Sequence, residues 1–227
     1  MSQAIARASR PGACFGFVVS LAVLGLGLNP VARAQESPTT MMRVSTRLVE
    51  PRPALNSSAA QARVIWRAGT KYGRIAEPAD TPNRVHGLMI INEPDAWLIN
   101  LFDKSGKHMV DPGPSLIVHI PIFAGVNVST KLTELEFGRE LEFFSKKGAQ
   151  LSEGEAINGK ATERYDVTIE NSKLVLWMDV ESKKPIRVSL VNGGQTRTLE
   201  YLSYDDGLAF DSSLFQPPAG IVMQNPK

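Results

Sequence analysis

The sequence predicts a mainly β protein: one strongly curved antiparallel sheet, or an incomplete β-barrel, of about 10–11 strands with one helix as a lid. Three observations predict this fold. Short runs of alternating or β-branched residues recur along most of the chain, with turn residues between them. One segment, residues 131–147, changes to helical spacing. The composition is that of an ordinary globular protein, with 43% hydrophobic and 21% charged residues.

The strands are predicted where apolar and polar residues alternate or where β-branched residues gather. The turns between them are short and rich in Gly, Pro, Asn and Asp, so neighbouring strands are expected to be antiparallel. The predicted strands are residues 42–49, 62–67, 71–77, 85–91, 96–103, 108–110, 116–123, 161–170, 173–180, 186–191 and 195–204.

Residues 131–147 are predicted to form the helix. Thr133 with Glu136 matches a capping box at its start, and Gly148 follows its lysine-rich end as residue C′. Such a helix would lie over the open side of the curved sheet and act as a lid. Its apolar face would consist of Leu132, Leu135, Leu141 and Phe144.

A sheet with this many strands is expected to enclose a volume. About ten strands cannot stay flat and open, and about eight already form a barrel that side chains can fill. A second layer, the helix or a ligand must fill the rest. An apolar stripe fits a solid core as well as a ligand pocket, so both interpretations stay open. The candidate ligand-binding residues are Trp97, Ile99, Leu101, Leu174, Leu176 and Met178 on strands and Leu132, Leu135, Leu141 and Phe144 on the lid.

Residues 1–34 have the layout of a secretory signal peptide. Two arginines precede an apolar run at residues 14–28, which is shorter than the roughly 20 residues that a membrane-spanning helix needs. Small residues precede the expected cleavage site between Ala34 and Gln35. We therefore favour cleavage over a retained anchor, and expect a periplasmic protein with one β domain at residues 35–227.

The composition of the expected mature chain excludes several classes of protein. The single cysteine, Cys14, lies in the segment to be removed, so neither a disulfide nor a cysteine-ligated metal is expected. Removing residues 1–34 also removes three arginines and no acidic residue, which leaves a nearly neutral chain. Such a chain lacks the basic surface that binds nucleic acid.

The last third of the sequence resembles a known family. Its landmarks, in chain order, are Lys160-Ala-Thr-Glu-Arg-Tyr165, Leu174-Val-Leu-Trp-Met-Asp179, Pro185-Ile-Arg-Val, Tyr201-Leu-Ser-Tyr204 and the segment from Leu208 to Gly220. This order is similar to the carboxy-terminal part of the bacterial LolA/LolB-like lipoprotein-carrier superfamily, in particular its outer-membrane lipoprotein-sorting branch. The resemblance covers about residues 150–223, and the rest of the chain matches by strand order.

The resemblance implies an unclosed antiparallel barrel in which helices cover an apolar cavity for acyl chains. It implies a cell-envelope binding or transport protein, a monomer without catalytic residues or cofactor. Its partners would be a lipid or an acylated protein, together with other envelope proteins. No residue for lipoprotein release is carried over, because none matches a position here.

Two other classes of function stay open. One is a hydrolase or metal-dependent enzyme, in which His108, Asp111 and His119 would form a two-His, one-carboxylate site. Asp103 with Asp111 is an alternative carboxylate pair for acid–base work. No His-Glu-x-x-His motif and no Gly-x-Ser-x-Gly elbow is present in the sequence. The other class is an envelope scaffold or folding helper with an exposed apolar patch.

Overall fold

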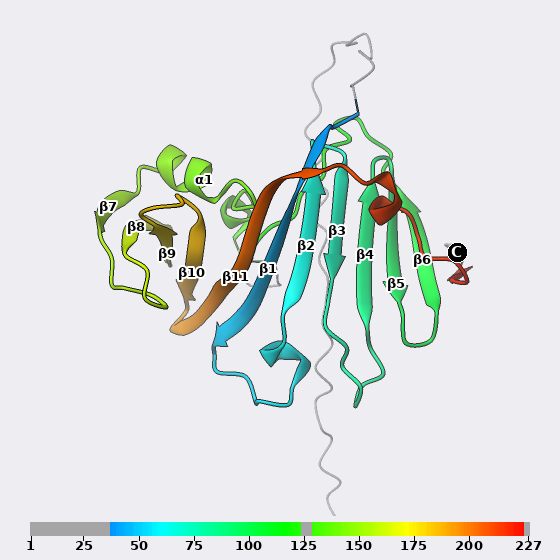
Figure 1. Ribbon diagram of the computed structural model, residues 1–227, viewed down its shortest axis with the longest axis horizontal. Helices are drawn as coiled ribbons and strands as arrows, with labels where there is room; N and C mark the ends of the chain where they lie inside the picture. Colours follow the sequence, from blue (N-terminus) through cyan, green and yellow to red (C-terminus); the bar gives the residue numbers. More distant parts are fainter. Residues whose placement is uncertain (1–36, 124–128, 225–227) are drawn as a thin grey trace, which may run out of the picture.

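The structure is a computed structural model that describes residues 37–123 and 129–224 (Figure 1). The expected signal peptide and its cleavage site between Ala34 and Gln35 lie outside the described residues. Six strands come first: β1 (Thr40–Glu50), β2 (Arg63–Ala68), β3 (Tyr72–Ala76), β4 (Gly87–Asn92), β5 (Asp95–Asn100) and β6 (Ser105–Val110). The later elements are α1 (Glu140–Lys146), β7 (Gln150–Glu153), β8 (Thr162–Ile169), β9 (Ser172–Asp179), β10 (Pro185–Asn192), β11 (Gln195–Ala209) and β12 (Val222–Gln224). Short 3₁₀ turns lie at Ser58–Ala60, Thr130–Leu132 and Ser212–Phe215.

The twelve strands of the described part of the chain form one curved, unclosed sheet. Their order is β12-β6-β5-β4-β3-β2-β1-β11-β10-β9-β8-β7. All neighbouring pairs are antiparallel except β12 with β6, which is parallel. In Figure 1, β2–β6 form one wall, and the long strands β1 and β11 carry the sheet round to β10–β7 beside α1. The predicted fold class, a mainly β protein with a strongly curved antiparallel sheet and one helix, is confirmed.

Ten predicted strands are confirmed, with boundaries that differ by a few residues. The strand predicted at residues 116–123 is wrong. Its backbone instead meets residues 135–137: the Ile122 amide donates to the Leu135 carbonyl (2.8 Å), and the Phe137 amide donates to the Ile120 carbonyl (3.1 Å). Sequence patterns missed β7 and β12, because one is wholly exposed and the other is three residues long.

The helix predicted at residues 131–147 is wrong over its first half, because α1 begins only at Glu140. Gly138 stands just before it with a φ of +86°, a conformation that L-residues with side chains rarely adopt. The Met42 side chain also fills the space that a Cβ at Gly138 would need. A continuous helix is thereby excluded. Gly148 is confirmed as the positive-φ residue after the helix.

The predicted capping box of Thr133 and Glu136 is also wrong. The Thr133 hydroxyl donates to the Thr130 carbonyl (2.6 Å), which closes a 3₁₀ turn. The Glu136 carboxylate instead points to Arg67 on β2. No helix in the described residues has the length and hydropathy to cross a membrane.

The two faces of the sheet are covered by different parts of the chain. The inner face is the one that contacts α1, and residues 118–123 and 129–137, here called the plug, also pack on it. The chain after β11 crosses the outer face of the first wall (Figure 1). It brings apolar residues against Leu88 and Ile90, namely Phe210, Leu214, Phe215, Ile221 and Met223. The core therefore has layers on both faces of the sheet.

Candidate functional site

The plug fills the middle of the inner face with the protein's own side chains. Val118, Ile120, Leu135 and Phe137 are all at most 1% exposed. The plug lies so close to β3 that a Cβ at Gly73 would collide with Val118 and Ile120. Two hollows lie towards the ends of this face: one of about 410 Å³ over β3–β6 and one of about 560 Å³ at β7–β9.

The hollow over β3–β6 has an apolar floor. Ile75, Met89 and Leu98 lie on neighbouring strands, in a row set by the pairs Ile75–Met89 and Met89–Leu98. Because side chains alternate along a strand, this row belongs to the inner face. Ligand pockets commonly enclose about 300–1,000 Å³, and a volume of about 410 Å³ falls in this range.

Charged residues border this hollow at opposite sides. Glu77 is held by Arg63, whose Nη2 lies 2.5 Å from its Oε1. Lys107 on β6 is exposed, and its side chain has no hydrogen bond or ion pair with any residue that the structure describes. A free ammonium group beside an apolar floor is suited to a ligand with an apolar chain and an anionic head.

The predicted ligand-binding residues separate into two groups. Trp97, Ile99 and Leu101 lie on the outer face against the chain after β11, although Ile99 also borders the hollow. Leu141 is 38% exposed and belongs to neither group. The others are buried together in the inner-face core: Leu132, Leu135, Phe144, Leu174, Leu176 and Met178. Their part in ligand binding stays a prediction.

Sequence reasoning missed the floor of the hollow. The signal was present, because residues 87–91 and 96–99 are apolar on both faces, with Leu98 directly beside Ile99. Alternation alone shows that a strand has two apolar faces, but not which one stays uncovered. The face of β5 that carries Trp97 is covered by the chain after β11.

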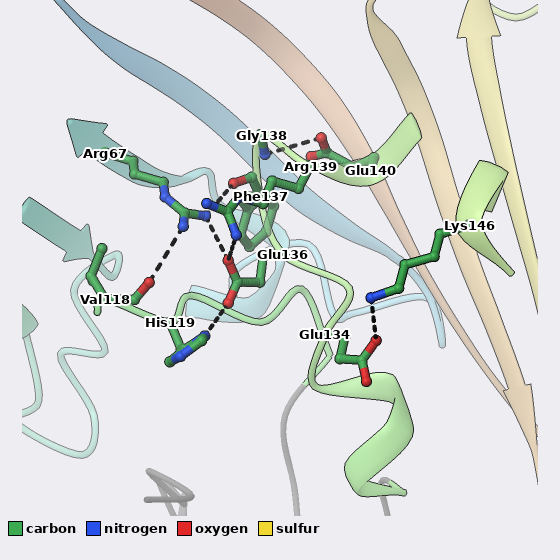
Figure 2. A network of polar contacts seen from close by, with 10 residues as sticks. All are labelled: Arg67, Val118, His119, Glu134, Glu136, Phe137, Gly138, Arg139, Glu140 and Lys146. Carbon is green, nitrogen blue, oxygen red and sulfur yellow. Dashed lines mark hydrogen bonds and ion pairs between the residues drawn. The ribbon is translucent and has the colours of Figure 1, made fainter. Parts of the chain in front are cut away.

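A buried polar network holds the plug on the sheet (Figure 2). Arg67 on β2 is 6% exposed and donates to the Glu136 carboxylate at 2.7 Å. The same guanidinium donates to the carbonyls of Phe137 (3.2 Å) and Val118 (3.3 Å). The Arg67 side chain thus binds both segments of the plug, residues 118–123 and residues 129–137. A buried ion pair requires this complete set of hydrogen bonds, because either charge left alone in the core is costly.

Glu136 has two further basic neighbours. His119 Nδ1 lies 2.5 Å from Glu136 Oε1, and Arg139 Nη1 lies 3.9 Å from Oε2 (Figure 2). The hydrogen bond to Glu136 raises the pKa of His119. Burial would raise the pKa of Glu136, but His119 and Arg67 outweigh it and hold that pKa below its ordinary value. The Glu136 side chain is therefore an ionised carboxylate that links the plug to β2.

Glu140 joins the start of α1 to β11. Its carboxyl accepts hydrogen bonds from the Tyr201 hydroxyl (2.9 Å) and the Gly138 amide (3.0 Å). Burial raises the pKa of Glu140 to about 7, although both hydrogen bonds favour the charged form. Burial and Glu140 together raise the pKa of Tyr201. This carboxyl is the one buried acid of the network that changes charge near neutral pH.

The residues of the predicted enzyme site have separate partners. His108 Nε2 lies 2.7 Å from the Asp95 carboxylate, whereas His119 lies beside Glu136. The Asp111 carboxylate accepts from the Gly113 amide (2.8 Å), and Asp103 accepts from Ser105. Within residues 37–123 and 129–224, no three His, Cys, Asp or Glu residues are grouped so that they could hold a metal ion. The predicted two-His, one-carboxylate site is thus wrong.

Comparison with known proteins places the chain beside distant structural neighbours. No protein-family model and no curated protein matches the sequence. An uncharacterised conserved protein from Thermus thermophilus is similar in structure, with a TM-score of 0.46 and 9% identity, over 83% of this chain and 91% of that chain. A LolA superfamily protein from Nitrosomonas europaea is similar with a TM-score of 0.32 and 12% identity, over 80% of this chain and 91% of that chain.

A third neighbour was solved as a complex of two proteins. It is the MucA/MucB complex of Pseudomonas aeruginosa, with a TM-score of 0.34, 12% identity and coverage of 80% of this chain and 57% of that chain. A putative outer membrane lipoprotein-sorting protein domain from Vibrio parahaemolyticus is also among the similar solved structures, with a TM-score of 0.25 and 14% identity, over 79% of this chain and 88% of that chain. At such TM-scores, neither a function nor a site is transferred from these proteins.

Proposed function

We propose that this protein binds and carries a lipid, or the acyl chain of a lipoprotein, in the periplasm. The acyl chain occupies the hollow over β3–β6, on the floor formed by Ile75, Met89 and Leu98. The observation that carries this proposal is a hollow whose apolar floor includes the partly exposed Met89 and Leu98, on a face whose middle is filled by the plug. The sequence resemblance to lipoprotein carriers in the last third of the chain supports it.

Burial of an alkyl chain is the main source of binding free energy. Each methylene group removed from water contributes about 0.8 kcal/mol, so ten contribute on the order of 8 kcal/mol. That corresponds to a dissociation constant of roughly 1 μM before the cost of association. Lys107 at the rim lies where it can neutralise a carboxylate or phosphate head. The ligand class is therefore an anionic amphiphile.

The compartment is part of the same proposal. We infer that residues 1–34 are removed after export, so that the mature protein begins at Gln35 as one β domain. It acts as a monomer in the cell envelope and needs no nucleic-acid partner. N-terminal sequencing of the protein from a periplasmic extract checks this step: a Gln35 start is expected, and an intact first segment contradicts it.

The ligand is tested by replacing one residue of the floor. The Leu98→Gln variant is expected to bind a dansyl-labelled fatty acid about tenfold more weakly than wild type, because a polar amide then faces the alkyl chain. The Leu151→Gln variant is the matched control, since it makes the same change in the hollow at the other end of the inner face. Fluorescence titration measures both.

Two outcomes would reject this site. One is equal affinity of wild type and the Leu98→Gln variant, and the other is weaker binding in the Leu151→Gln variant alone. A second comparison tests the head group: Lys107→Glu is expected to weaken binding of the fatty acid and to leave that of the matching fatty alcohol unchanged. Mass spectrometry of an organic extract of the native protein identifies the bound lipid, and repeated absence of any lipid contradicts the proposal.

A further inference from the structure

One edge of the sheet is open to another strand. β7 pairs with β8 and with no other strand in the described part of the chain. All four of its residues, Gln150–Glu153, are exposed. At the opposite edge, β12 is a three-residue strand parallel to β6, and its Met223 packs into the apolar cluster on the outer face of the sheet. An edge with unpaired backbone groups is a template for strand addition.

The register shows which backbone groups of β7 are free. The Gly154 amide donates to the Thr162 carbonyl (2.9 Å), so this pair is a hydrogen-bonded one. Hydrogen-bonded and non-hydrogen-bonded pairs alternate along an antiparallel ladder. Ser152 and Gln150 therefore point their backbone groups to β8. Those of Leu151 and Glu153 point away from the sheet, at the spacing that a new strand requires.

A hollow lies beside these two residues on the inner face. It has a volume of about 560 Å³, and its walls include Leu151, Val180 and the small residues Gly154, Ala156 and Ala161. Leu151 is 59% exposed and Val180 is 42% exposed, although both are large and apolar. An aliphatic side chain from an added strand would cover them.

The charge beside the hollow is acidic. Glu153 lies directly opposite Glu163 of β8, and both border the hollow. Glu163 is paired with Lys183 at 2.7 Å, but Glu153 has no ion pair with any described residue. Opposite charges on facing strands stabilise pairing and like charges oppose it. The edge therefore favours a segment with a basic residue and disfavours an acidic one.

We propose that β7 binds an extended segment of another protein by antiparallel strand addition. Such a segment places a basic side chain opposite Glu153 and, two residues later, an aliphatic side chain opposite Leu151, where it enters the hollow. Because the new strand runs antiparallel to β7, its pattern reads Lys-x-Val or a close equivalent. This surface lies at the other end of the sheet from the hollow over β3–β6, so it does not depend on the proposed lipid site.

The test uses two labelled peptides and the purified full-length protein. One peptide contains Thr-Lys-Thr-Val-Thr, and the other has Glu in place of Lys. Fluorescence anisotropy is expected to show that wild type prefers the Lys peptide by about two- to fivefold, and that Glu153→Lys reverses the preference. Glu142→Lys is the matched control, because it makes the same charge change on the exposed side of α1 and should keep the wild-type preference.

Backbone pairing is tested separately. Leu151→Pro removes an outward amide without removing a hydrogen bond to β8, and it is expected to abolish peptide binding while the circular dichroism spectrum stays native. Hydrogen exchange of the wild type should show protection of residues 150–153 when the Lys peptide is added. Equal affinity for both peptides, protection elsewhere, or a concentration-dependent dimer joined through β7 would overturn the proposal.

Discussion

The middle of the inner face and its end over β3–β6 differ in how their apolar side chains are covered. In the middle, the plug covers the sheet, and its charged groups are buried because Arg67 and Glu136 satisfy each other and the neighbouring carbonyls. Over β3–β6, Met89 and Leu98 stay partly exposed, and the charges remain at the rim. The comparison shows that, where the plug covers this face, the two buried charges are paired with each other. At the end over β3–β6, two apolar side chains of the floor stay partly exposed.

The largest expected effect comes from breaking the buried ion pair. Arg67→Ala leaves the Glu136 carboxylate without its main partner in the core, and unfolding free energy should fall by about 3–5 kcal/mol. Arg63→Ala is the matched control, since its ion pair with Glu77 is more exposed and its loss should cost at most about 1 kcal/mol. Urea denaturation measures both, and equal losses would contradict the contrast between the two regions.

A pair of leucine substitutions compares the filled and open regions directly. Leu176→Ala in the inner core should lower unfolding free energy by about 2–5 kcal/mol, because Leu176 is fully buried and leaves a cavity. Leu98→Ala should cost less, since its side chain is only partly covered. Thermal and urea unfolding are the measurements. If Leu98→Ala is as destabilising as Leu176→Ala, the hollow over β3–β6 is a core region and not a binding surface.

The smallest expected effect depends on pH and concerns Glu140. Its pKa is about 7 in the folded protein and near 4.5 when unfolded, so the folded state binds the proton more tightly. Stability from this group is complete below about pH 4.5 and falls as pH rises to about 7, by up to about 3 kcal/mol. Glu140→Gln removes that fall, so its stability relative to wild type should increase between pH 5 and pH 8.

Glu142→Gln, on the exposed side of α1, is the control and should follow the wild-type pH profile. Urea midpoints measured across this pH range decide the question. A constant difference between wild type and Glu140→Gln would show that the Glu140 carboxyl does not titrate in this window. An opposite slope would show that its charged form is the stabilising one.

Much of the sheet is predictable from local pattern. Residues 174–178 are a continuous apolar run, and the two-residue period of a strand assigns both faces of β9 correctly, with Leu174 and Leu176 on one side and Val175 and Trp177 on the other. Turn residues such as Gly193 and Gly194 mark the hairpins, and both have positive φ. The plug was not predictable in this way. Its apolar residues suggested a strand at 116–123, which is wrong, and a helix from 131, which in the structure begins only at Glu140.

The sequence by itself determined ten of the twelve described strands, the turns between them and which residues are apolar, because these properties follow from side-chain period and backbone preference. Only the tertiary structure decided what covers each face. Arg67 and Glu136 are 69 positions apart, and β7 and β12 become edges only when the whole sheet is assembled. The spacing of apolar side chains along a strand shows that a face is apolar. Contacts between distant segments determine whether that face is covered, borders a hollow or forms an open edge.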